Sequence, residues 1–152
     1  MVSVRVNNFE AIQPTGADFR DLPIEKAFTW EEGLADTGSD GMYLVVFRSR
    51  RNADATSEHV ERLVELDEIA YQDAQEPDGF GMYWQDAELS EAGVGRSFCI
   101  WDSQEQARQA AKNPRHHAAV TFIMENAVYT EYSIATYQIH TTEAGVTFAE
   151  AA

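Results

Sequence analysis

The sequence has one cysteine, Cys99, and few basic residues: 11 lysines and arginines stand against 26 aspartates and glutamates in 152 residues. A single cysteine cannot form an internal disulfide, so nothing points to an oxidising compartment. The net charge of −15 repels phosphate backbones and anionic membrane surfaces, which argues against nucleic-acid and membrane partners. The excess of acidic residues indicates either a solvated surface that keeps the protein soluble or an acidic docking face.

Long apolar segments and nucleotide-binding motifs are also missing. No stretch approaches membrane-spanning length, and residues 1–10 lack the basic start and apolar run of a secretion signal, so we expect a cytoplasmic protein. The sequence has no phosphate-cradling glycine loop, cysteine cluster or dinucleotide fingerprint, which disfavours nucleotide cofactors. Its three Trp, six Tyr and eight Phe suffice for the core of one domain.

Residues 56–75 carry the pattern of an amphipathic helix. On a helical wheel their apolar side chains, which include Leu63 and Tyr71, fall on one narrow arc, opposite several glutamates. Asp67 lies near the middle of the apolar arc. An isolated buried charge is too costly to keep, so this carboxylate must be paired, protonated or directed into a wet cavity.

A second helical region begins at residues 102–106, where Ser103 and Gln106 have capping-box spacing. Residues 113–114, Asn followed by Pro, interrupt this helix and favour its renewal. On the renewed helix His116 lies within the apolar arc and His117 at its edge. His116 therefore repeats the unusual inward placement of Asp67.

Four segments have the composition and alternation of strands, namely residues 42–49, 80–85, 96–101 and 130–140. With the helices they give the order β-α-β-β-α-β, the ferredoxin-like α+β arrangement, in which a four-stranded antiparallel sheet has both helices on one face.

Three regions follow from this pattern. Residues 41–140 form the ferredoxin-like domain, residues 1–40 an N-terminal extension packed on it or on a partner copy, and residues 141–152 a poorly ordered tail. The sheet face without helices carries large apolar residues and needs cover, which a second copy would supply.

The run SFCIWDSQEQARQAAKNPRHHAAV, followed by YTEYSIATYQI, resembles the second half of dimeric α+β-barrel proteins of the antibiotic-biosynthesis-monooxygenase-like group. Those proteins have a strand ending in Trp, a Ser-capped Ala-rich helix, a Pro-x-His break and a Tyr-rich last strand. The resemblance covers residues 41–140 and implies a homodimer whose sheets pack face to face. It also implies a small-molecule cavity between sheet and helices in each subunit. Activities in this superfamily include cofactor-free oxygenation of activated phenols, isomerisation, cyclisation, dehydration and haem chemistry.

In this topology Asp67 and His116 point into the same layer between the helices and the sheet. If their depths match, His116 acts as proton acid or base while Asp67 orients its ring. Tyr71, one turn beyond Asp67, could donate a hydrogen bond to a developing oxyanion. The alternatives are a structural hydrogen bond or wet core pocket for the Asp–His pair, and a core position for Tyr71.

Further candidates bind substrate rather than react with it. Only one parity of each strand reaches the cavity, so Trp101 or Trp84 lines it, together with Tyr83. Arg48 belongs to a basic cluster that either balances rim carboxylates or positions an anion at the pocket mouth. His117, at the edge of the apolar arc of its helix, is a further candidate for substrate binding. Because adjacent helical histidines point about 100° apart, they cannot easily share an ion, and no metal site is expected.

The leading hypothesis is a cofactor-independent monooxygenase-, isomerase- or cyclase-type enzyme that acts on a small, flat, partly apolar molecule by proton transfer. One alternative is a non-catalytic ligand-binding or stress-related module. The other is a haem-binding or haem-degrading protein, with haem held through a helical histidine.

Overall fold

The computed structural model describes residues 9–34, 40–74, 79–86, 88–112, 114–142 and 144–151, apart from the side chains of Ala74, Arg115 and His116. The elements in chain order are η1 (Phe9–Ala11), α1 (Ile24–Ala27), α2 (Trp30–Leu34), β1 (Tyr43–Arg51), α3 (Ser57–Ala74), β2 (Phe80–Trp84), β3 (Val94–Trp101), α4 (Gln104–Ala111), α5 (Pro114–Asn126), β4 (Tyr129–Thr142) and β5 (Gly145–Glu150).

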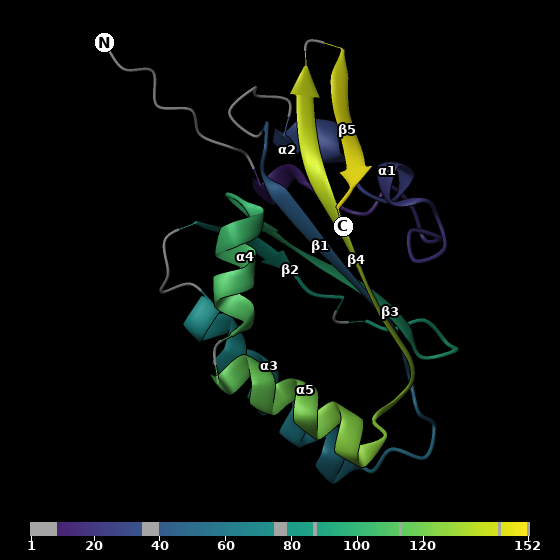
Figure 1. Ribbon diagram of the computed structural model, residues 1–152. Coiled ribbons are helices and arrows are strands. Elements are labelled where there is room, and N and C mark those ends of the chain that lie inside the picture. The colour runs from purple at the N-terminus through teal and green to yellow at the C-terminus, as the bar shows by residue number, and fades with distance from the viewer. Residues whose placement is uncertain are drawn as a thin grey trace.

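The strands form one antiparallel sheet in the order β2-β3-β1-β4-β5. Helices α3, α4 and α5 lie on one face of this sheet, and α3 runs beside α5 (Figure 1). The βαββαβ order and the ferredoxin-like α+β fold predicted from the sequence are confirmed. The start of α4 follows the predicted capping box, because Ser103 Oγ accepts a hydrogen bond from the backbone N–H of Gln106.

The expected tail is wrong: β4 continues to Thr142, and β5 adds a fifth strand beside it. Gly145 begins this strand with a φ of 133°, a backbone conformation that favours glycine. Thr141 is buried despite its hydroxyl group, and Val146 and Phe148 pack against the core. The polar residues of this segment, such as its threonines, suggested a disordered tail, although they alternate with apolar residues as in a strand.

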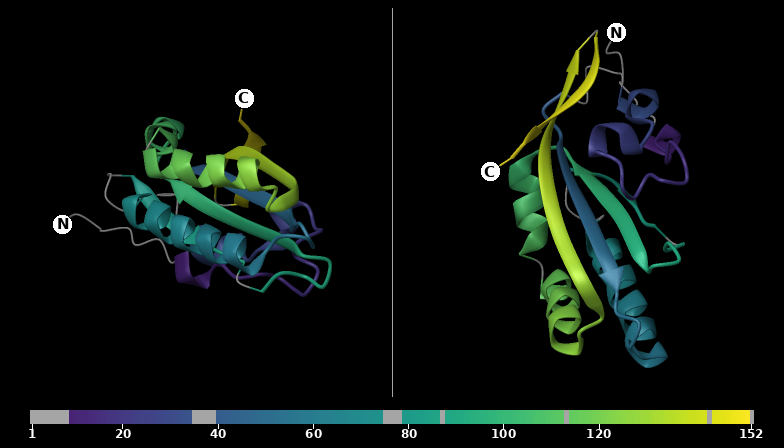
Figure 2. Two further views of the ribbon diagram at one scale, coloured as in Figure 1. Left: turned by 90° about the horizontal axis from the view of Figure 1, so that it is seen from below. Right: turned by 90° about the vertical axis from the view of Figure 1, so that its right-hand side faces the viewer.

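Residues 9–34 pack on the sheet face opposite α3, α4 and α5, which we call the outer face. Figure 2 shows α1 and α2 on the side of the sheet away from α4 and α5. They bury one core with the outer-face side chains of the strands, and this core includes Ile12, Phe28, Trp30, Leu34, Leu44, Val46, Phe98, Ile100 and Ile139. This segment supplies the apolar cover that the sequence analysis assigned to a second copy.

A buried ion pair fastens the segment to the connection between β2 and β3. Arg20 Nε donates to Asp86 Oδ2 at 2.6 Å and its Nη2 to Asp86 Oδ1 at 2.9 Å, and the Asp86 side chain is only 4% exposed. Asp86 also accepts a hydrogen bond from the backbone N–H of Arg96. The carboxylate thus has a partner on each side, as a buried charge requires.

Candidate functional site

A cavity of about 560 Å³ lies between the sheet and the three long helices. Its volume falls within the roughly 300–1,000 Å³ of small-molecule sites. The sheet face that lines it, here the cavity face, presents the odd-numbered residues of β1 and β3, which are Tyr43, Val45, Phe47, Ser49, Arg51, Gly95, Ser97, Cys99 and Trp101. The helices contribute small and apolar side chains, among them Leu63, Ala70, Ala107, Ala110, Val120 and Ile123.

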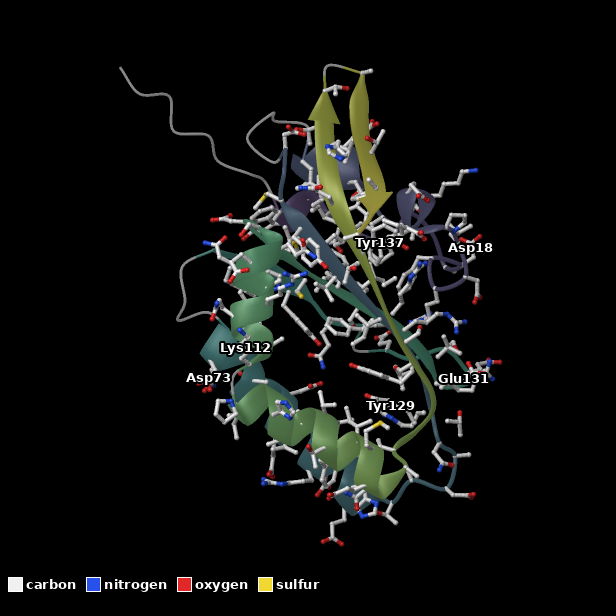
Figure 3. The ribbon with its side chains drawn as sticks, viewed as in Figure 1. Asp18, Asp73, Lys112, Tyr129, Glu131 and Tyr137 are labelled. Atoms are coloured by element: carbon white, nitrogen blue, oxygen red, sulfur yellow. The ribbon has the colours of Figure 1, made fainter. Side chains whose placement is uncertain are left out.

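A β-bulge changes the side-chain pattern at one end of the cavity. Arg50 pairs with Glu131, whereas its neighbour Arg51 pairs with Tyr129, so one extra residue stands in β4 between these two partners. Strict alternation would place Tyr129 on the outer face with Glu131, but the bulge brings it to the cavity face with Tyr132. The two tyrosine rings stack at 5.7 Å with an interplanar angle of 15°. Figure 3 labels Tyr129 beside the hollow between α5 and the sheet.

Asp67 reaches the cavity from the inner face of α3, where Leu63 and Tyr71 also line it. Burial raises the pKa of its carboxyl from 3.8 to about 6, because removal from water disfavours the charged form. The charge of Asp67 in turn helps to raise the pKa of Tyr83 and Tyr129. Asp67 therefore shares one poorly solvated space with these phenols.

The Cys99 thiol and three of the phenols that line the cavity stay protonated at neutral pH. Burial raises the pKa of the Cys99 thiol to about 12, and Trp101 Nε1 donates to its sulfur at 3.2 Å. Desolvation of the hydroxyl raises the pKa of Tyr132 to about 12. Tyr83 and Tyr129 shift in the same direction for the same main reason. Around Asp67 the cavity thus offers neutral hydrogen-bond donors and no thiolate nucleophile.

The structure brings Asp67, Tyr71, Tyr83 and Trp101 together on the wall of this one cavity. The Tyr71 ring lies 5.5 Å from that of Tyr83, centroid to centroid, so the two phenols form one side of the space. What these residues do there stays a prediction.

The two histidines of α5 are not among the described residues of the cavity wall. His117 is exposed, outside the set that lines the cavity. His116 belongs to the first turn of α5, but its side chain lies outside the described part of the structure. The described residues therefore do not test the predicted Asp67–His116 pair.

Two candidates are placed elsewhere. Trp84 points to the outer face, because its neighbour Tyr83 takes the inward parity of β2, and it packs 5.5 Å from Phe19 and 5.1 Å from Phe28. Arg48 is also on the outer face, where it pairs with Asp21 at 3.2 Å and Glu131 at 3.7 Å. Of the two tryptophans, Trp101 lines the cavity and Trp84 does not, and Arg48 balances carboxylates instead of standing at the pocket mouth, because strand parity turns both Trp84 and Arg48 to the outer face.

Sequence reasoning missed Arg51, Tyr129 and Tyr132 as cavity residues. Arg51 was visible only as one member of a basic cluster, and the tyrosines only as part of a Tyr-rich strand. The bulge that joins them on one face has no clear signal in residue types, because Thr130 and Glu131 suit an ordinary strand.

Within the described ranges, no three His, Cys, Asp or Glu side chains are grouped so that they could hold a metal ion. The same ranges contain no helix that is long and apolar enough to cross a membrane.

Solved structures resemble this chain in fold. A variant of SnoaB, a cofactor-independent oxygenase from Streptomyces nogalater, has a TM-score of 0.52 and 13% identity, covering 66% of this chain and 95% of that one. A candidate antibiotic biosynthesis monooxygenase from Deinococcus radiodurans has a TM-score of 0.52 and 19% identity, covering 66% and 94%. A dimeric protein of unknown function with a ferredoxin-like fold from Bacteroides fragilis has a TM-score of 0.52 and 13% identity, covering 65% and 97%.

These likenesses show the fold and confirm the predicted resemblance to the antibiotic-biosynthesis-monooxygenase-like superfamily at that level. No curated protein matches the sequence. A family model described as PB2B2.08-like matches residues 4–150, and the chain therefore belongs to the PB2B2.08-like family.

Proposed function

We propose that the cavity binds a small, flat, partly apolar molecule and that the protein acts on it by cofactor-independent proton transfer, with Asp67 as the proton acceptor. One observation carries this proposal: a carboxyl group with a pKa of about 6 stands in a ligand-sized cavity with aromatic walls. A general base works best when its pKa lies near the working pH, and burial moves Asp67 in that direction.

The surroundings of Asp67 suit the removal of a proton from an acidic C–H or phenol. Flat rings would pack against Phe80, Tyr43 and Trp101, and the neutral phenols of Tyr83 and Tyr129 offer hydrogen bonds to the oxygen that gains charge. That a fold neighbour is described as a cofactor-independent oxygenase supports chemistry of this kind.

The version in which His116 exchanges the proton and Asp67 orients the imidazole stays a prediction. Replacing His116 by Ala separates the two versions. If Asp67 acts alone, the variant keeps its activity, and if the pair acts together, the variant loses it.

The test uses anthrone, a flat tricyclic ketone with an acidic methylene group, in D2O. The protein should accelerate exchange of the methylene hydrogens for deuterium, followed by NMR. Asp67→Asn should reduce this acceleration by about 100-fold or more, the usual contribution of a general base. Glu61→Gln, on the exposed side of the same helix, is the matched control and should exchange like the wild type.

Unchanged exchange in Asp67→Asn would remove the proton-transfer mechanism. Anthrone binding without accelerated exchange would favour the second candidate, a non-catalytic ligand-binding module. The largely apolar lining of the cavity favours this alternative, since it suits binding without requiring any reaction. In that case ligand affinity survives the loss of the Asp67 carboxylate.

We also propose that the protein is a cytoplasmic homodimer. The description of the Bacteroides fragilis neighbour as dimeric supports the assembly. Because residues 9–34 cover the apolar part of the outer face, sheets packed face to face would meet through its uncovered part, which carries Arg48, Arg50 and Glu131.

A further inference from the structure

Arg51 brings a positive charge to the inner end of the cavity. Its side chain follows Tyr43, Val45, Phe47 and Ser49 along the cavity face of β1. Two other basic residues, Arg108 and Lys112, line the cavity from α4, and both are exposed. Arg51 is partly buried, and its Nε atom is fully shielded from solvent. Of the three, Arg51 is the cation that a bound molecule would meet away from water.

The guanidinium of Arg51 has hydrogen-bonding capacity to spare. Among the described residues, its Nε has no hydrogen-bond partner and no carboxylate lies within ion-pair distance of it. Its neighbours on the outer face are paired, since Arg48 and Arg50 both contact Glu131. A cation that has no paired anion and borders a largely apolar space attracts an incoming negative charge.

Tyr129 holds a second donor at the same end. Hydrogen-bond donation from Arg51 and Ser49 toward its hydroxyl oxygen acts to lower its pKa, against the larger effect of burial, and leaves the hydroxyl proton free to be donated. The bulge at Arg50/Arg51 creates this arrangement by placing Arg51 and Tyr129 opposite each other on the cavity face. The pair forms a preorganised fork of donors at the end of an apolar, aromatic-lined space.

We infer that Arg51 and Tyr129 bind a carboxylate group of the ligand, so that the molecule taken by the cavity is a flat, partly apolar carboxylic acid. A guanidinium matches a carboxylate with two parallel N–H···O bonds, a geometry that a neutral group cannot reproduce. This inference rests on the proposed function and adds the class of molecule to it. Asp67 and Tyr129 line the same cavity, so a molecule that fills it can contact both groups.

The experiment compares two probes of the same shape, 2-naphthoate and its neutral isostere 2-naphthamide, at pH 7.5 by isothermal titration calorimetry. Wild-type protein should bind the carboxylate at least 10-fold more tightly than the amide. Arg51→Gln should bring the two affinities within about twofold of each other. Arg50→Gln, which changes the adjacent residue on the outer face, should keep the preference and so serves as the matched control.

Three results would overturn the inference: equal affinity of the wild type for both probes, a preference that persists in Arg51→Gln, and binding of neither probe. Should Arg51→Gln not fold, as judged by its circular dichroism, a crystal structure of wild-type protein with 2-naphthoate decides the question. The carboxylate must lie within hydrogen-bond distance of the Arg51 guanidinium or the Tyr129 hydroxyl, and any other position overturns the inference.

Asp67→Asn separates this inference from the proposed function. That variant should keep the preference for 2-naphthoate while losing proton exchange with anthrone. Loss of the preference in Arg51→Gln with exchange unaffected by Asp67→Asn would leave a carboxylate-binding cavity without the proposed chemistry.

Discussion

Asp67 makes the cavity useful at a cost to the stability of the folded chain. Its carboxyl is easier to ionise in the unfolded chain, where the pKa is near 3.8, than in the folded protein, where it is about 6. The folded state therefore disfavours the ionised form. The contribution of Asp67 to the stability of the fold is most favourable below about pH 3, falls as the pH rises from there through about 6, and changes no further above that range.

We predict that Asp67→Asn is more stable than the wild type at pH 7.5 by about 2 kcal/mol, since an amide of the same shape carries no charge to desolvate. The difference should nearly vanish at about pH 3, where the carboxyl is almost fully protonated in both the folded and the unfolded wild type. Urea denaturation at the two pH values measures it. A variant that is less stable at pH 7.5 would mean that the charge has a stabilising partner.

At the level of elements, the N-terminal segment is joined to the sheet by a contact between distant parts of the sequence. Arg20 precedes α1, whereas Asp86 follows β2, and the two side chains are 15% and 4% exposed. Arg96 adds hydrogen bonds from its guanidinium to the carbonyl groups of Phe19 and Leu22. The cover of the outer face thus depends on a few polar contacts as well as on its apolar core.

Arg20→Ala should lower the free energy of unfolding by about 3–5 kcal/mol, because it leaves the Asp86 carboxylate buried without its main partner. The control is Arg62→Ala, which removes an exposed Arg–Glu65 pair on α3 and should cost less than about 1 kcal/mol. Both values come from chemical denaturation. Equal effects of the two substitutions would show that the Arg20 pair contributes no more than a surface pair.

For the molecule as a whole, the proposed homodimer makes a prediction about mass and about one charged patch. We expect sedimentation velocity to give twice the mass of the chain. In a face-to-face dimer, Glu131→Arg replaces the carboxylate that pairs with Arg48 and Arg50 and places three like charges on each outer face. This variant should dissociate, whereas Glu65→Arg on the exposed surface of α3 should remain dimeric. A dimer that survives Glu131→Arg would contradict face-to-face packing.

The fold was predictable from the sequence because its signals are local. The period of α3, the Ser103 cap and the β-rich runs depend on residues within a few positions of one another. The cavity residues were harder, since Trp84 and Trp101 look equivalent until the register of each strand decides their faces. Tyr129 required a bulge, and the cover by residues 9–34 required contacts across the whole chain, such as Phe28 with Phe98. Neither leaves a short-range pattern.

The two faces of the sheet have different surroundings: the outer face is packed into a hydrophobic core, and the cavity face borders an open space. Leu44 and Val46 serve the first, while Val45 and Phe47, their immediate neighbours, border the second. Adjacent codons of β1 should thus evolve under separate pressures, one for folding and one for choice of ligand. A library restricted to the odd positions of β1 and β3 would therefore change the walls of the cavity while leaving the core beneath residues 9–34 unaltered.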